Sequence, residues 1–316
     1  MSQLKKVQAM FAQDIVDACN NGICPWQSPV FGKVVAEARS VPEGRRYSGM
    51  NSMLLALRMI ENGWKRPFFG TFKAWTGKMN TKVKKGAKSC SVTFFSHFPK
   101  KDKDGNIMRD EDGEPITYPM LKWYSVCNVE DTEADLSKFD VEERGDIPDA
   151  MTMAAVIKAT SPYITKYRLQ LSYDKDAECG RYELTTDRVV MPPPSRYTSF
   201  AAFCEGLLHE LAHSTMTEGR LNRPQSDKPS KRAEEELTAE IASSIIMTQL
   251  GIPHTKYNDG SEAWKSYCVG WAQKINEDPS IIWKAAGNGI KAAEFILGYK
   301  FADAEQATTE EKVEEN

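Results

Sequence analysis

The spacing of apolar residues changes along the first 130 residues of the chain. At the start, Val7, Phe11 and Ile15 recur every four residues and the run ends at Asn-Gly, which predicts an amphipathic helix. Further on, segments rich in Thr, Val and aromatic residues indicate strands. The elements predicted here are a helix over 4–22, irregular proline-containing chain over 23–46, a helix over 51–62, strands at 91–95 and 121–129, and an exposed charged loop over 100–115.

From residue 149 onward, short strand patterns give way to long helical ones. A run of three prolines, residues 192–194, ends the last predicted strand. The elements predicted here are a helix over 149–160, strands near 167–173, 181–184 and 188–191, and helices over 197–216, 231–250, 262–275 and 281–297.

These patterns predict an α+β fold in two domains. The chain has 316 residues, which is long for one hydrophobic core. An acidic stretch poor in large apolar residues separates the two patterns and is typical of a linker. The predicted boundaries are a first domain over 1–130, the linker over 131–148, a second domain over 149–300 with a small antiparallel or mixed sheet plus helices, and a disordered acidic tail over 301–316.

Hydropathy excludes a membrane protein of the helical type. No stretch approaches the roughly 18 consecutive apolar residues of a membrane span, and the charged N-terminus lacks the apolar core of a signal peptide. We therefore expect a cytoplasmic protein without a membrane partner.

Charge is divided unevenly between the two parts. Residues 1–130 contain 20 Lys and Arg against 12 Asp and Glu, a net of +8, whereas residues 131–316 contain 21 against 32, a net of −11. The net charge of the whole chain, −3, conceals this difference. The asymmetry indicates that the first part faces a polyanion.

A metal-binding pattern lies in the segment LLHELAHSTM, residues 207–216. His209 and His213 stand four residues apart, so one face of a helix brings both rings to a single ion. Glu210 is placed to act as general base on water at that ion, because zinc lowers the pKa of such water. Zn²⁺ is therefore the expected cofactor and Glu210 the candidate catalytic residue.

A third protein ligand is expected from the helix that follows, within EEELTAE, residues 234–240. We favour Glu236, with Glu235 as the alternative, and expect Glu240 to accept the free ring N–H of a histidine ligand. Glu210 could instead lie beside a structural ion without catalysing anything. An oxyanion-stabilising group could come from Tyr182, Tyr197 or the loop 217–229, and the sequence does not choose among them.

Basic and aromatic residues are interleaved in the first 100 residues. Single-stranded nucleic acid is held by cations on its phosphates and by rings stacked on its bases. The alternative is that the aromatic residues form a core and the lysines a solvated face. The candidate DNA-binding residues are Arg45, Arg46, Tyr47, Asn51, Lys73, Trp75, Lys82, Lys84, Lys85 and Lys88.

The order of several short motifs resembles the plasmid antirestriction proteins of the ArdC type, over about residues 4 to 300. In the second half the resemblance rests on LLHELAHST, on GRLNR and on AEEELTAE. One departure is that Ser214, Thr215 and Met216 follow the second histidine where the family usually has an aromatic residue and then Thr-Gly. The motifs of the first half are Pro25-Trp26, YSGMN at 47–51, GTFKAW at 70–75, VKKGAKS at 83–89 and WYSVCNVE at 123–130.

The resemblance implies an N-terminal domain that binds single-stranded DNA and a C-terminal zincin-like metallopeptidase domain. It also implies zinc on His209, His213 and a glutamate of the EEELTAE helix, and protection of incoming plasmid or phage DNA from host restriction. The expected partners are single-stranded DNA and a protein, either a substrate or a restriction nuclease. The competing hypothesis is a non-catalytic protein that coats single strands or accompanies a primase, with zinc in a structural role.

Overall fold

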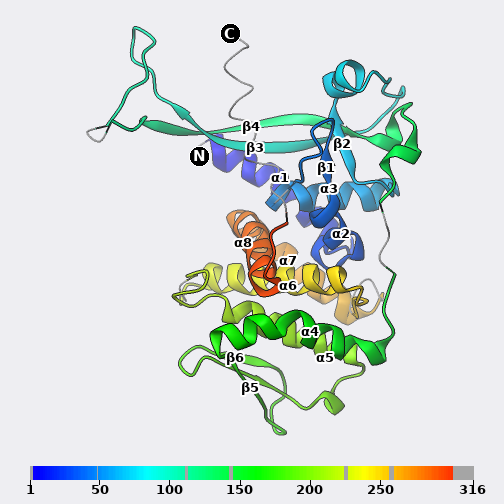
Figure 1. Cartoon of the computed structure of the whole chain (residues 1–316), viewed down its shortest axis with the longest axis vertical. Coiled ribbons are helices and arrows are strands. Elements are labelled where there is room, and N and C mark those ends of the chain that lie inside the picture. Colours follow the sequence, from blue (N-terminus) through cyan, green and yellow to red (C-terminus); the bar gives the residue numbers. More distant parts are fainter. Residues whose placement is uncertain are drawn as a thin grey trace.

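The computed structural model combines helices with two small sheets, in agreement with the predicted α+β class (Figure 1). No helix among the residues it describes is both long enough and apolar enough to cross a membrane. The described residues are 3–47, 49–110, 113–141, 145–223, 227–255 and 260–301.

The first sheet has the strand order β1-β2-β4-β3. Strands β3 and β4 form a long antiparallel hairpin, from the pair Ser89 and Cys127 to the pair Pro99 and Thr117. Both predicted strands are confirmed but are longer than expected, because the hairpin continues outward from the sheet (Figure 1). The strands are β1 (Arg39–Ser40), β2 (Phe68–Thr71), β3 (Ser89–Pro99) and β4 (Thr117–Asn128).

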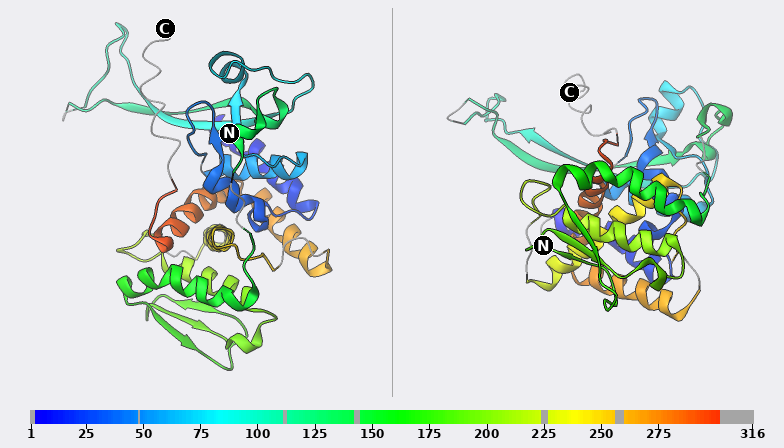
Figure 2. Two further views of the ribbon diagram at one scale, coloured as in Figure 1. Left: turned by 45° about the vertical axis from the view of Figure 1, so that its right-hand side comes forward. Right: turned by 60° about the horizontal axis from the view of Figure 1, so that its bottom comes forward.

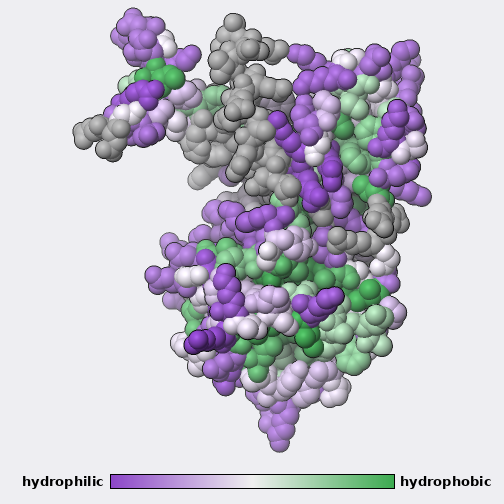
Figure 3. All heavy atoms as spheres, in the orientation of Figure 1, coloured by the Kyte–Doolittle hydropathy of each residue, from purple (hydrophilic) through white to green (hydrophobic). Residues whose placement is uncertain are grey.

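The outer end of this hairpin carries the charged segment that the sequence predicted to be exposed. Its described residues between 100 and 115 are exposed almost throughout, and hydrophilic residues dominate this projecting end in Figure 3. Residues 111 and 112 lie outside the described part of the chain.

Helices α1 (Gln3–Asn20) and α3 (Gly49–Asn62) lie on one face of the first sheet (Figures 1 and 2). Between α1 and α3 in the sequence is α2 (Pro29–Glu37), a helix in the segment predicted to be irregular. That prediction was wrong because Pro29 occupies the first turn of the helix, where proline costs no hydrogen bond, and the Ser28 side chain caps it by accepting from the Val30 N–H.

The second sheet has the order β5-β7-β6 and is mixed, with β5 (Gln170–Tyr173) parallel and β6 (Arg181–Glu183) antiparallel to β7 (Arg188–Met191). Helices α4 (Asp149–Tyr167) and α5 (Phe200–Ser214) cover this sheet (Figure 2).

Three further helices, α6 (Pro229–Leu250), α7 (Glu262–Glu277) and α8 (Ser280–Leu297), connect the two parts of the molecule. Helices α1 and α2 pack on α7 and α6, so buried residues of both parts form one continuous cluster. Phe139, within the predicted linker, packs on Trp75 of the first part. The two parts are thus joined by a packed face as well as by the chain between them.

Candidate metal centre and its surroundings

Helix α5 is fixed at its first turn before it presents the two histidines. The Ser199 side chain accepts from the Ala202 N–H at 3.0 Å, and the Asp149 carboxylate accepts from the N–H groups of Phe200 and Ala201. Buried apolar residues such as Leu208 hold the opposite face of the helix in the core, each contributing roughly 1.5–3 kcal/mol.

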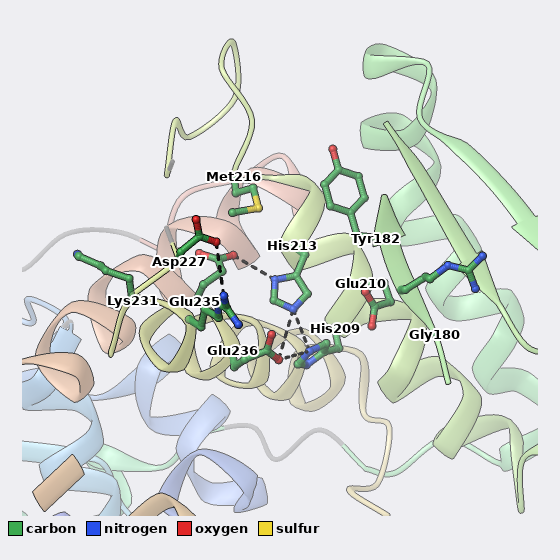
Figure 4. Close-up of a pocket in the computed structure, with 12 residues that line it drawn as sticks. Gly180, Tyr182, His209, Glu210, His213, Met216, Asp227, Lys231, Glu235 and Glu236 are labelled. Carbon is green, nitrogen blue, oxygen red and sulfur yellow. Dashed lines mark hydrogen bonds and ion pairs between the residues drawn. The ribbon is translucent and has the colours of Figure 1, made fainter. Parts of the chain in front are cut away.

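His209, His213 and Glu236 converge at the crossing of α5 and α6 (Figure 4). The two Nε2 atoms are 3.1 Å apart, and Glu236 Oε2 lies 3.4 Å from His209 Nε2 and 3.7 Å from His213 Nε2. Ligand atoms about 2.0–2.1 Å from a tetrahedral ion would be about 3.4 Å apart. The three side chains therefore fit a single divalent metal ion.

Glu235 interacts with the outer nitrogen of His213. Its Oε1 lies 3.2 Å from His213 Nδ1, and Arg223 donates to both carboxylate oxygens at 2.7 and 2.8 Å. Arg223 itself is held by the Thr215 hydroxyl and the Ala212 carbonyl. Glu235 thus holds the His213 ring with Nε2 facing the ion position.

Glu240 does not make the contact that we expected of it. Its carboxylate accepts a hydrogen bond from Gln27 Nε2 at 2.8 Å, whereas the interaction with a histidine ring is made by Glu235. The reason is the direction in which α6 crosses α5: one turn beyond Glu236 the helix has left the histidines and faces the N-terminal part.

Loss of Arg223 should weaken metal binding without removing a ligand. In Arg223→Met we expect about a tenfold weaker affinity for Zn²⁺, because Glu235 and then the His213 ring lose their fixed orientation. Competition with a coloured chelator measures this affinity. Arg188→Met, which breaks an ion pair between β7 and Glu183 of β6, is the matched control and should bind Zn²⁺ like the unaltered protein.

In the metal-free centre, His213 and the nearby carboxylates stabilise each other's charged forms. Burial alone would lower the pKa of His213, but hydrogen bonds to Glu235 and Glu236 and the nearby carboxylates raise it to about 10. Hydrogen bonds from His209 and His213 hold the pKa of Glu236 well below its ordinary value. Without metal, His213 is therefore an imidazolium at neutral pH and Glu236 a carboxylate.

Metal binding should consequently release protons. A ligating imidazole is neutral, so His213, protonated below its pKa of about 10, must lose its proton when Zn²⁺ binds at pH 7. We expect about one proton or more per ion, and an affinity that rises with pH up to about 10. Calorimetric titrations in buffers of different ionisation enthalpy count these protons. A result near zero would contradict the protonated state of His213.

A pocket of about 540 Å³ opens onto the metal centre, and Glu210 is part of its wall. Only 9% of Glu210 is exposed. Gly180, the residue before β6, lies so close that a Cβ there would be 3.1 Å from Glu210 Cγ and 2.7 Å from Met191 Sδ. A larger residue at this position would have to displace the Met191 side chain and press on Glu210.

The tyrosines considered as oxyanion-stabilising groups lie in different surroundings. Tyr182 lines the pocket, but its hydroxyl donates to Asp187 at 2.7 Å and points away from the histidines (Figure 4). Burial and Asp187 raise the pKa of Tyr182 above its ordinary value. The Tyr197 ring packs edge-on against Phe203.

The candidate DNA-binding residues are divided between the surface and the interior. Trp75 is fully buried, and its indole N–H donates to the Cys127 carbonyl at 3.1 Å, so it cannot stack on a base. Tyr47 packs against Phe69, and Asn51 bonds both backbone groups of Thr93. Arg45 and Arg46 are half-buried, whereas Lys73, Lys82, Lys84, Lys85 and Lys88 are exposed.

Of the residues that the structure describes in the first part, the two most exposed aromatic ones were not among the sequence candidates. Phe72 is 65% exposed directly after β2, and Trp123 is 49% exposed in β4. Val126, which pairs with Thr71, faces the helices, and strand residues alternate between faces. Trp123, three residues from Val126, therefore faces away from α1 and α3. Phe72 follows Thr71 directly, at the point where the chain leaves β2 and enters a helical turn. Basic-aromatic alternation around Lys73 was the signal that could have identified Phe72.

Comparison with known proteins agrees with both halves of the structure. Residues 5–127 match the family described as the N-terminal domain of anti-restriction factor ArdC, and residues 162–288 match the family described as zincin-like metallopeptidase. The chain is therefore an ArdC-type protein. The metal-free crystal structure of the antirestriction ArdC protein from the R388 plasmid has a TM-score of 0.68 at 25% identity, over 93% of this chain and 98% of that one.

Other relatives extend the comparison. The Mn(II)-bound structure of the R388 protein shares the fold, with a TM-score of 0.66 at 23% identity, over 92% of this chain and 97% of that one. A DNA primase TraC of Escherichia coli is 25% identical over 331 residues, covering 99% of this ArdC-type chain but only 29% of the primase. An uncharacterized protein, y4eC of Sinorhizobium fredii, is 22% identical over 274 residues, covering 86% of this chain and 84% of that protein. This chain thus corresponds to less than a third of the length of that primase.

Proposed function

We propose that this ArdC-type chain is a zinc-dependent peptidase that acts on proteins bound to single-stranded DNA, and that it thereby protects incoming plasmid or phage DNA from restriction. The observation that carries the proposal is the convergence of His209, His213 and Glu236, with Glu210 in the wall of the same pocket. Two imidazoles and one carboxylate form the donor set of catalytic zinc sites that leave a fourth position open.

The groups at the pocket would have different roles in peptide hydrolysis. Zinc, when bound, would supply the Lewis acid that polarises the peptide carbonyl and acidifies water. Glu210, largely withdrawn from solvent, takes the proton of the attacking water and passes it to the leaving amine. Strand β6 is one of the two edge strands of its sheet, and an extended peptide would pair with it beside Gly180 and Arg181, which line the pocket.

The DNA-binding surface in this proposal is the outer face of the first sheet. Phe72 and Trp123 would stack on bases there, and the exposed lysines between residues 73 and 88 would contact phosphates. The Lys84 ammonium bonds the Glu130 carbonyl, which holds the lysine-rich loop against the end of β4. Stacking and phosphate contacts suit single strands of any sequence.

The test is proteolysis by the full chain in three forms: loaded with Zn²⁺, stripped by a chelator, and reloaded. Each is incubated with a mixture of DNA-binding proteins, with and without a single-stranded oligonucleotide, and products are identified by mass spectrometry. The proposal expects cleavage that needs Zn²⁺ and increases with the oligonucleotide. Absence of cleavage by a Zn²⁺-loaded, DNA-binding protein would refute it.

The match to DNA primases along nearly the whole chain favours a second candidate, a non-catalytic module that coats single strands near a replication enzyme. In that case metal-stripped protein that remains folded would still protect DNA from a restriction nuclease. Protection that disappears with the metal and returns with it supports the peptidase instead.

A further inference from the structure

One face of helix α6 runs from the metal centre to the N-terminal part of the molecule. Glu236, Glu240, Ser244 and Thr248 recur every four residues and therefore lie along one stripe of the helix. Glu236 belongs to the metal centre. The other three contact residues 26–32 of the N-terminal part: Glu240 and Ser244 by hydrogen bonds, and Thr248 by packing.

The contacts along this stripe are short and buried. Gln27 Nε2 donates to Glu240 Oε2 at 2.8 Å, and the Ser244 hydroxyl donates to the Trp26 carbonyl. Thr248 lies against Gly32 so closely that a Cβ on Gly32 would be 2.4 Å from Thr248 Cβ. The packing leaves α6 little freedom to turn or slide relative to this segment.

Gln27 is itself rigidly placed. Its neighbour Trp26 is fully buried and packs edge-on against Trp271 with ring centroids 6.1 Å apart. Gln27 is 1% exposed, and its Oε1 has no hydrogen-bond partner among the residues that the structure describes. Burying a polar group with one unsatisfied atom costs stability, so an apolar side chain would serve packing better.

We propose that Gln27 is a positioning residue for the metal centre. By holding Glu240, it fixes the turn of α6 next to Glu236 and so sets the distance between the Glu236 carboxylate and the two histidines. The N-terminal part, which the proposed function assigns to DNA, therefore helps to build the metal centre of the C-terminal part. This inference rests on the metal centre but not on peptidase activity.

The test measures metal affinity in the full chain without any substrate. In Gln27→Met, which keeps the volume and removes the hydrogen bond, we expect Zn²⁺ to bind about tenfold more weakly. The visible absorption bands of bound Co²⁺ should also change, because they report ligand geometry. Trp264→Phe is the matched control: it removes the 2.7 Å bond from the Trp264 indole to the Gly22 carbonyl, which joins the same two parts through α7.

The control separates positioning from general loosening. Both variants should lower the thermal unfolding midpoint, but only Gln27→Met should alter Zn²⁺ affinity and the Co²⁺ spectrum. Equal effects of the two variants on the metal, or unaltered binding in Gln27→Met, would overturn the proposal.

If Gln27→Met does not fold, variants of Glu240 decide the question. Glu240→Gln still accepts from Gln27 and should bind Zn²⁺ within about twofold of the unaltered affinity, while Glu240→Met should weaken it about tenfold. Equal affinities in these two variants would refute the role of the hydrogen bond. Loss of peptidase activity is not a readout here, so failure of the proposed function would leave this result interpretable.

Discussion

Replacing Glu210 by Gln should abolish peptide hydrolysis while leaving the metal in place. We expect a loss of about 1,000-fold in kcat, since general base catalysis of this kind contributes about 100- to 10,000-fold. The amide has nearly the same shape as the carboxylate but accepts no proton at neutral pH. Glu210 lines the pocket, and it is not one of the three residues whose ligand atoms converge. Zn²⁺ content and oligonucleotide affinity should therefore be unchanged.

The measurement is the initial rate of cleavage of a DNA-bound protein, with Zn²⁺ content determined in the same samples. Glu178→Gln, an equivalent change of charge at an exposed residue two positions before Gly180, is the matched control and should cleave normally. If Glu210→Gln retained Zn²⁺ and still cleaved at the rate of the unaltered protein, Glu210 would have no catalytic role.

The sequence predicted that the two histidines lie together, but for the third ligand it only reduced the choice to a few glutamates. His209 and His213 share a helix, so their relation depends on helical geometry alone. Which glutamate of 234–240 meets them depends on how α6 crosses α5, a tertiary property without a local signal. The structure places the Glu236 carboxylate 3.4 and 3.7 Å from the Nε2 atoms of His209 and His213. Glu235 lies against His213 Nδ1, and Glu240 is turned toward Gln27.

The exposure of the aromatic residues in the first part also depends on tertiary structure that the local sequence does not predict. Phe72 and Trp75 lie three residues apart in one motif, yet Phe72 is exposed and Trp75 is fully buried. The chain turns sharply after β2 into the short helix Ala74–Lys78, which folds Trp75 back onto Gly70 and Cys127. Composition predicted that this part contains both basic and aromatic residues, but which ring faces solvent is decided by this turn.

Removing both exposed rings should therefore weaken single-stranded DNA binding much more than removing either one. Stacking contributes about 1–3 kcal/mol per base, so Phe72→Ala and Trp123→Ala should each reduce affinity roughly tenfold, and the double variant roughly 100-fold. Fluorescence anisotropy of a labelled oligonucleotide at fixed salt measures this. Tyr173→Ala, at an exposed aromatic residue of the second sheet, is the control and should bind normally. A folded double variant with unaltered affinity would exclude the outer face of the first sheet as the binding surface.

The salt dependence of binding distinguishes stacking contacts from phosphate contacts. The slope of affinity against salt concentration depends on the number of phosphate contacts, so the double variant should keep this slope. Replacing Lys84 or Lys85 should reduce it.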